Sequence, residues 1–172
     1  TVSANLAVTW AEEKKRVLLV DADLRRPTVH QTFGVSNRYG LSNIITSSSS
    51  TVNASEMIDK TEIENIDVLT SGPTPPNPAE LLGSNRLSQL LDFVREKDDF
   101  IIVDDAPVDT VTDGQIVAER ADGVALVTPQ GIATKDAVMR AVKLLQRVNA
   151  NILGVIMNRF TVQEAGGYYG GY

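Results

Sequence analysis

Cysteine is absent from the 172 residues of this sequence, and histidine occurs only once, as His30. Without cysteine, the chain can form neither a disulfide nor a thiolate metal site. A single imidazole cannot supply a multi-histidine metal site, and one histidine without suitable partners argues against a histidine-based catalytic triad. Carboxylates, hydroxyls and backbone amides must therefore carry any reaction that the protein performs.

Other absences narrow the class of protein further. No run of eighteen apolar residues occurs, so we expect no transmembrane helix, and no cleavable signal peptide begins at Thr1. The net charge of −6 argues against nucleic-acid binding, because such binding needs a basic face. These features, with the missing cysteine, are typical of a protein of the reducing cytoplasm.

The apolar residues gather in short continuous runs rather than in alternating patterns. Such runs are typical of strands buried on both faces of a parallel sheet. Four runs are clear and one is weaker: Val17–Val20, Phe100–Val103, Val124–Val127 and Ile152–Met157, then Ile66–Leu69. Segments with helical spacing separate them, over Val2–Glu13, Arg86–Arg95 and Lys135–Val148. This alternation predicts a three-layer α/β fold with a mainly parallel sheet.

Three segments interrupt this alternation of strands and helices. Thr46–Thr51 is rich in serine and predicts a surface loop, and the four prolines within Gly72–Pro78 predict a stiff, extended connection. The glycines and tyrosines of Gly166–Tyr172 cannot pack a core. We therefore predict one core domain over residues 1–165, followed by a flexible tyrosine-rich tail over residues 166–172.

The first candidate for chemistry lies where the first strand is expected to end. Asp21 and Asp23 follow the apolar run, and Arg25 and Arg26 come directly behind them. Ligands bind at the carboxyl ends of strands in open α/β sheets. If the strand continues, both carboxylates point to the same side. Two carboxylates beside two guanidinium groups suit Mg²⁺ and phosphate. The alternative is a polar loop with surface ion pairs.

A second strand end carries the same kind of side chain. The apolar run Phe100–Val103 is followed by Asp104 and Asp105, which is the Walker B arrangement. In that arrangement the carboxylate holds Mg²⁺, usually through water. One such strand end is weak evidence, but two in one chain allow a single metal ion to sit between them.

The two ends of the chain are also unusual in composition. Thr1–Ala7 begins as a helix with small and hydroxyl residues, like the helix that follows a P-loop and holds phosphates, although an ordinary amphipathic helix fits as well. Tyr168, Tyr169 and Tyr172 are three of the four tyrosines, and they lie among glycines. They are either phosphate acceptors or part of a low-complexity tail.

Taken together, these segments resemble the bacterial tyrosine kinases of the capsule and exopolysaccharide type. The matching segments are Leu18–Pro27 with the Walker A′ motif, Ser71–Ser84 with the proline-rich linker, Phe100–Pro107 with Walker B, Gly154–Arg159 with the adenine-contacting strand, and the tail with the tyrosine cluster. The five segments occur in family order. The resemblance implies a P-loop NTPase-like fold related to MinD and ParA, with ATP and Mg²⁺ as cofactors and tyrosine as the acceptor.

The resemblance implies a role for each candidate residue. Asp21 would accept the proton of the tyrosine hydroxyl, and Asp23 and Asp104 would hold Mg²⁺. The remaining positions would bind the nucleotide or receive the phosphate: Thr1 at phosphate or the metal shell, Arg25 and Arg26 at phosphate or a neighbouring subunit, Asn158 at adenine, and Tyr168, Tyr169 and Tyr172 as acceptors.

The family resemblance also implies partners. Its members form ring-like homo-oligomers in which neighbouring subunits phosphorylate each other. A membrane adaptor activates the kinase, so a cytoplasmic chain would be recruited to the inner face of the cell membrane. A cognate phosphotyrosine phosphatase is the last partner that the resemblance implies, and nucleic acid is not among the expected partners.

Two features depart from the family pattern. The glycine-rich P-loop, its Lys and the strand before it are not in this sequence, and the loss of a central parallel strand leaves two sheet edges open. We therefore expect the chain as given to be inactive alone, with upstream residues omitted. Asp105 stands where the family usually has Thr, and its charge would either strengthen Mg²⁺ binding or raise a neighbouring pKa.

Two other functions compete with the kinase interpretation. One is a MinD- or ParA-like ATPase switch, which shares the fold and metal site but needs no tyrosine tail. The other is a non-catalytic regulator of polysaccharide assembly, which the missing P-loop Lys favours. The proline-rich linker and the three tail tyrosines favour the kinase.

Overall fold

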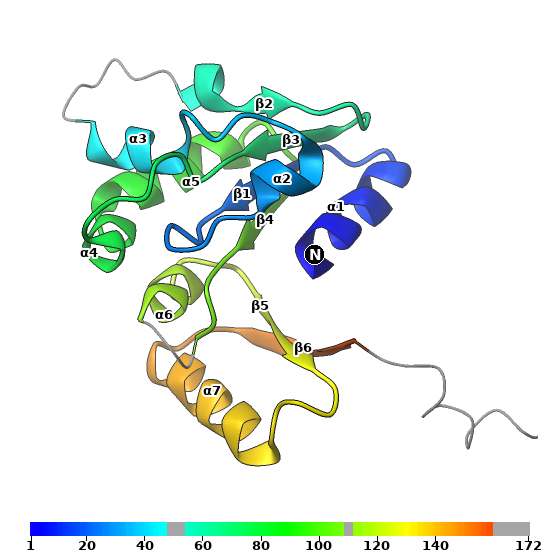
Figure 1. The fold of residues 1–172 in the computed structure, drawn as a ribbon, viewed down its shortest axis with the longest axis vertical. Helices are drawn as coiled ribbons and strands as arrows, with labels where there is room; N and C mark the ends of the chain where they lie inside the picture. Colours follow the sequence, from blue (N-terminus) through cyan, green and yellow to red (C-terminus); the bar gives the residue numbers. More distant parts are fainter. Residues whose placement is uncertain (48–53, 109–111, 160–172) are drawn as a thin grey trace, which may run out of the picture.

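The computed structural model describes residues 1–47, 54–108 and 112–159 (Figure 1). The predicted tyrosine tail lies outside the described residues, so the proposed division into core and tail stays a prediction. The helices are α1 (Val2–Glu12), α2 (Val29–Phe33), α3 (Leu41–Thr46), α4 (Pro78–Leu82), α5 (Asn85–Arg95), α6 (Asp113–Ala118) and α7 (Lys135–Arg147), with a 3₁₀ turn at Ala54–Met57. No helix in the described part is long and apolar enough to span a membrane.

The strands form two sheets in the described part of the chain. The strands are β1 (Val17–Asp21), β2 (Asp59–Lys60), β3 (Ile66–Leu69), β4 (Phe100–Asp104), β5 (Val124–Pro129) and β6 (Ile152–Asn158). One sheet has the order β2-β3-β1-β4, and the other pairs β5 with β6. Every pair is parallel except β2 with β3. All five apolar runs are therefore strands, and the predicted, mainly parallel pairing is confirmed.

The four-stranded sheet is covered by helices on both faces. Leu18 and Val20 of β1 pack into one core with apolar residues of α3, α4 and α5. Val17 and Leu19 point to the other face and pack with three alanines of α1 and with Val29 of α2. All of β1 is buried because its side chains alternate between these two cores. This half of the molecule has the predicted three layers.

The two-stranded sheet is covered less completely. Figure 1 shows this sheet and helix α7 below the main sheet. Helix α7 contacts β6, and its Ala141 and Leu145 are buried. Leu153, Val155 and Met157 of β6 are 71%, 49% and 59% exposed. The expectation that every apolar run is buried on both faces is therefore wrong for β5 and β6. Consecutive residues of β6 are exposed, so neither face of this strand is fully covered within the described residues.

The main sheet ends at an open edge where β4 lies. Strand β4 pairs only with β1, and β5 pairs only with β6, within the described residues. Phe100 at the start of β4 stacks on Trp10 of α1 with 4.1 Å between ring centroids, yet it remains 38% exposed. Within the described residues, each of the two sheets therefore has an open edge.

Candidate functional site

The two carboxylate-bearing strand ends lie side by side. Asp21 is the last residue of β1 and Asp104 the last of β4, and the two are partners in the parallel register. The Ala22 N–H continues the pairing by donating to the Asp104 carbonyl at 2.7 Å. The two carboxylate-bearing residues therefore lie next to each other at the carboxyl ends of the parallel strands, as the sequence predicted.

Asp21 is a completely buried carboxylate. Its Oδ2 accepts hydrogen bonds from the backbone N–H groups of Thr28 (3.1 Å) and Val29 (3.0 Å), where α2 begins. Its Oδ1 is buried and has no partner among the described residues. Burial raises the pKa of Asp21 to about 6, and the charges of Asp104 and Asp23 add to the rise although the two N–H groups oppose it. Such a carboxylate is ionised at neutral pH and can accept a proton.

Asp23 lies beyond the end of the strand. Because β1 stops at Asp21, the condition under which strand alternation would put Asp21 and Asp23 on the same side is not met. The chain turns instead, and Asp23 Oδ1 accepts the backbone N–H groups of Arg25 (3.1 Å) and Arg26 (2.9 Å). This turn is the kind that Asp favours locally. The Asp23 carboxylate still lies close enough to Asp21 and Asp104 for its charge to raise the pKa of both.

The first turn of α1 contacts the Asp104 carboxylate. Burial raises the pKa of Asp104, Asp23 adds to the rise, and a hydrogen bond from the Ser3 side chain lowers it. Thr1 caps the helix by accepting the Ala4 N–H at 3.2 Å, and its hydroxyl lies 2.8 Å from that of Ser3. The predicted phosphate-binding start of α1 therefore lies next to Asp104, with Ser3 as a contact that the sequence did not single out.

Asp105 is a further acid at this edge. Its Oδ1 accepts the Ala106 N–H at 2.7 Å, and its Oδ2 is buried without a partner among the described residues. Burial raises the pKa of Asp105 to about 7, with the charges of Asp113, Asp23 and Asp104 adding to it. Burial is the larger cause, and the like charges act on Asp105 itself, so the predicted effect of Asp105 on a neighbouring pKa or on Mg²⁺ stays a prediction.

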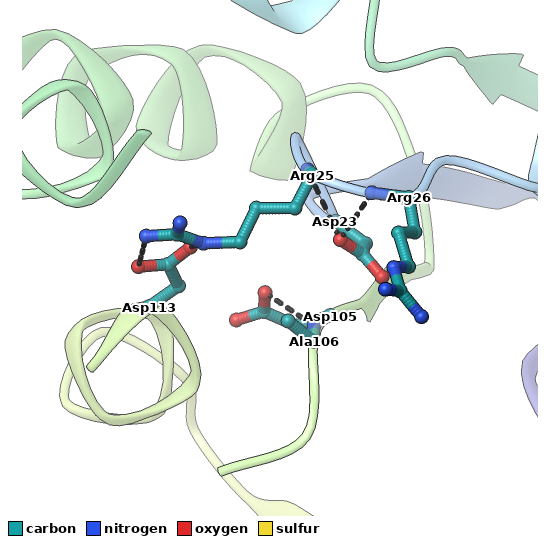
Figure 2. Close-up of polar contacts among 6 residues, drawn as sticks. All are labelled: Asp23, Arg25, Arg26, Asp105, Ala106 and Asp113. Atoms are coloured by element: carbon teal, nitrogen blue, oxygen red, sulfur yellow. Dashed lines mark hydrogen bonds and ion pairs between the residues drawn. The ribbon is translucent and has the colours of Figure 1, made fainter. Parts of the chain in front are cut away.

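The two arginines of the A′ segment have different surroundings (Figure 2). The Arg25 guanidinium pairs with Asp113 through Nε to Oδ2 at 2.7 Å and Nη2 to Oδ1 at 3.2 Å. The Arg26 side chain is exposed, points away from Asp113, and has no partner in the described part of the chain. Sequence reasoning missed Asp113, because no local pattern links it to an arginine 88 residues away.

Asn158 lies on the other sheet. It ends β6, opposite Pro129 of β5, and is exposed. Its side-chain Oδ1 accepts the Arg159 N–H at 2.8 Å, and its carbonyl accepts the Gln130 N–H. It is thus at a carboxyl strand end, as predicted, but in the half of the molecule that does not hold the carboxylates. Tyr168, Tyr169 and Tyr172 lie outside the described residues.

A hollow of about 580 Å³ lies elsewhere on the molecule. It is lined by residues at the amino ends of β1 and β3, including Arg16 and Ile66, and by Lys60, Lys97 and Asp98. Because the strands are parallel, the carboxylates lie at the opposite ends. The hollow therefore takes no part in the candidate site.

Comparison with known proteins first defines the class. A model of the ParA family, described as an iron-transfer P-loop NTPase of the NUBPL type, matches residues 1–167. The structure also resembles that of the septum site-determining protein MinD complexed with Mg-ADP from Pyrococcus horikoshii OT3, with a TM-score of 0.76 and 25% identity over 94% of this chain and 65% of that one. The predicted MinD/ParA-related P-loop NTPase fold is confirmed.

More similar proteins define the family. The tyrosine-protein kinase YwqD of Bacillus subtilis is 41% identical over 99% of this chain and 71% of its own length, and the putative tyrosine-protein kinase CapB of Staphylococcus aureus is 37% identical over 98% and 72%. The solved kinase domain of the Escherichia coli tyrosine kinase ETK has a TM-score of 0.89 and 34% identity, over 99% of this chain and 66% of that one. The chain belongs to the bacterial tyrosine kinases.

Proposed function

We propose that this chain is the core of an ATP-dependent protein-tyrosine autokinase that phosphorylates its own C-terminal tyrosines and regulates capsular or exopolysaccharide synthesis. Asp21 carries the proposal. It combines complete burial, an oxygen without a partner among the described residues, and a pKa near 6 at the meeting point of two strand ends. A general base works best when its pKa lies near the working pH, which favours Asp21 over an ordinary exposed carboxylate.

The residues at the strand ends fit a magnesium ion and phosphates. Asp23 and Asp104 offer hard oxygen ligands, and the unpartnered Oδ1 of Asp21 marks a polar atom that lacks a ligand. No group of three acidic or histidine ligands occurs among the described residues, so the protein alone would not complete a coordination shell. Mg²⁺ usually takes one or two carboxylates and fills its shell with water and phosphate oxygens, which agrees with this sparse set.

Each residue has a role in the proposed transfer. The tyrosine hydroxyl oxygen bonds to the terminal phosphorus of ATP while the bond to the bridging oxygen breaks, ADP leaves, and the hydroxyl proton passes to Asp21. Asp23 and Asp104 would hold Mg²⁺, whose charge offsets that of the phosphates. Thr1 and Arg26 would contact phosphate, and Asn158 would hydrogen-bond adenine.

We further propose that the reaction takes place between subunits of a ring-like homo-oligomer. The partners would be a membrane adaptor that recruits the cytoplasmic chain to the inner face of the cell membrane and a cognate phosphotyrosine phosphatase. Each phosphorylated tyrosine adds about −1.5 to −2 charges. Like charge on neighbouring tails should therefore loosen the ring. Light scattering before and after phosphorylation measures this, and an unchanged particle size would contradict it.

Intact-mass spectrometry of the full-length protein, before and after incubation with MgATP, tests the kinase proposal. We expect mass steps of one phosphate that map to Tyr168, Tyr169 or Tyr172. Asp21→Asn should reduce their rate by roughly 100-fold or more, because the proton acceptor is lost. Asp92→Asn is the matched control, since Asp92 is 74% exposed on α5, and it should leave the rate unchanged.

Measurements of nucleotide binding and ATP hydrolysis on the same sample separate the alternative functions. The likeness to MinD supports an ATPase switch, which would hydrolyse ATP without any mass step on tyrosine. A non-catalytic regulator of polysaccharide assembly would bind no nucleotide at all. Full phosphorylation by the Asp21→Asn variant would remove Asp21 from the proposed role even if the kinase activity itself is present.

A further inference from the structure

A single connected network joins α6 to the loop that carries Asp23. At one end, Asp113 is the first residue of α6 and is 1% exposed. Its two carboxylate oxygens accept Nε (2.7 Å) and Nη2 (3.2 Å) of Arg25, a paired geometry that fixes the guanidinium in direction as well as distance. The Arg25 side chain itself is 42% exposed, so only the acid is deeply buried.

At its other end the network reaches the candidate metal ligand. The backbone N–H of Arg25 and that of Arg26 both donate to Oδ1 of Asp23. Arg25 therefore links the two acids: its side chain pairs with Asp113, and its backbone N–H donates to Asp23. Figure 2 shows this order directly, from Asp113 through Arg25 to Asp23.

The start of α6 also packs against the loop that follows Asp104. A Cβ added at Gly114 would lie 3.1 Å from the Ala106 carbonyl oxygen and 3.3 Å from Cα of Val108, so the helix and this loop are in close backbone contact. The start of α6 thus contacts both the loop after β1, through Asp113, and the loop after β4, through Gly114.

We propose that Asp113 is a positioning residue that, through Arg25, sets the place of Asp23 relative to Asp104 at the candidate magnesium site. This inference rests on the proposed function and deepens it. It also assigns different roles to Arg25 and Arg26, the two arginines of the segment Leu18–Pro27. The Arg25 side chain is committed to the fold, and Arg26 is the one whose guanidinium is available to a phosphate or a neighbouring subunit.

The first test measures amide hydrogen exchange in the full-length protein, without nucleotide. Asp113→Asn weakens the ion pair at nearly constant volume. The matched control is Asp122→Asn, because Asp122 pairs with Arg95 by two bonds of 3.1 and 3.2 Å but is 90% exposed. We expect exchange over residues 22–28 to rise about tenfold in Asp113→Asn only, while residues 17–21 of buried β1 stay protected.

The second test measures the Mg²⁺ concentration that gives half-maximal tyrosine phosphorylation. Groups that orient a metal ligand typically change metal affinity or activity by about 10- to 100-fold. We expect Asp113→Asn to raise this concentration about tenfold, with much of the kcat recovered at saturating Mg²⁺. Arg25→Lys, which keeps the charge but not the paired geometry, should fall between Asp113→Asn and wild type.

The outcomes distinguish this inference from the proposed function. If Asp113→Asn folds and leaves both the exchange over residues 22–28 and the Mg²⁺ midpoint unchanged, the ion pair only stabilises the fold and the inference is wrong. If the wild-type protein phosphorylates no tyrosine, the proposed function fails, but the exchange experiment still decides whether Asp113 holds the loop. Should Asp113→Asn not fold, Arg25→Lys decides by the same exchange measurement.

Discussion

Strands β1 and β6 are both continuous apolar runs, yet they have opposite surroundings. Every residue of β1 is buried, whereas Leu153, Val155 and Met157 of β6 are 71%, 49% and 59% exposed. Cores lie on both faces of β1, whereas β6 packs against α7 and keeps most of its residues exposed. An apolar run therefore indicates a strand, but the helices that the rest of the chain supplies determine how much of it is buried.

A pair of leucines measures this difference most directly. Leu19→Ala in β1 removes a completely buried side chain and should cost about 2–5 kcal/mol in the free energy of unfolding. Leu153→Ala in β6 removes a side chain that is 71% exposed and should change it by less than about 0.5 kcal/mol. Urea unfolding followed by circular dichroism measures both. Equal losses would mean that the face of β6 is covered in solution.

A pair of glycines tests the same contrast through backbone packing. A Cβ at Gly40 would lie 2.1 Å from the Thr70 carbonyl oxygen and 2.5 Å from the Gly72 nitrogen, whereas nothing lies within 4 Å of a Cβ at Gly154 in β6. Gly40→Ala should therefore destabilise the protein by about 1–3 kcal/mol.

Gly154→Ala is the matched control and should be neutral or stabilising by about 0.5 kcal/mol, because alanine has less freedom to lose on folding. The melting temperatures of the two variants give the comparison. A tolerated Gly40→Ala would show that the close approach of the two loops can relax.

The buried carboxylate of Asp21, at the end of β1, should make the stability of the protein depend on pH. Because folding raises the pKa of Asp21 from 3.8 to about 6, the folded state holds this proton more tightly than the unfolded state. The contribution of Asp21 to the free energy of unfolding is therefore fully present below about pH 4 and is lost as the pH rises through about 6. Asp21→Asn should thus stabilise the protein by about 1–2 kcal/mol at pH 8 while abolishing phosphorylation.

Unfolding measurements at pH 4 and pH 8 check this prediction. The stabilisation by Asp21→Asn should disappear at pH 4, where aspartic acid at this position is already neutral in the folded state. A gain of equal size at both pH values would have to come from packing instead. Asp92→Asn, on the exposed face of α5, should show no gain at either pH.

Much of the site could be predicted because it depends on local sequence and on one general property of parallel sheets. Apolar runs that end in Asp21 and Asp104 place carboxylates at the same edge, since parallel strands end together. The burial and raised pKa of Asp21 could not be predicted, because they arise from how α2 closes over the strand end. The role of Asp113 is equally non-local, since its partner lies far away in the chain.

The sequence by itself determined five of the six described strands, the positions of the acids at the strand ends and the family, because these follow from periodicity and from motifs a few residues long. It indicated neither the short strand β2 nor the order of the strands in the sheet. The tertiary structure decided which apolar strands are buried, which of two adjacent arginines is committed to an ion pair, and which carboxylate is driven to a higher pKa. Burial and electrostatics depend on groups brought together from distant parts of the chain, and no local pattern records them.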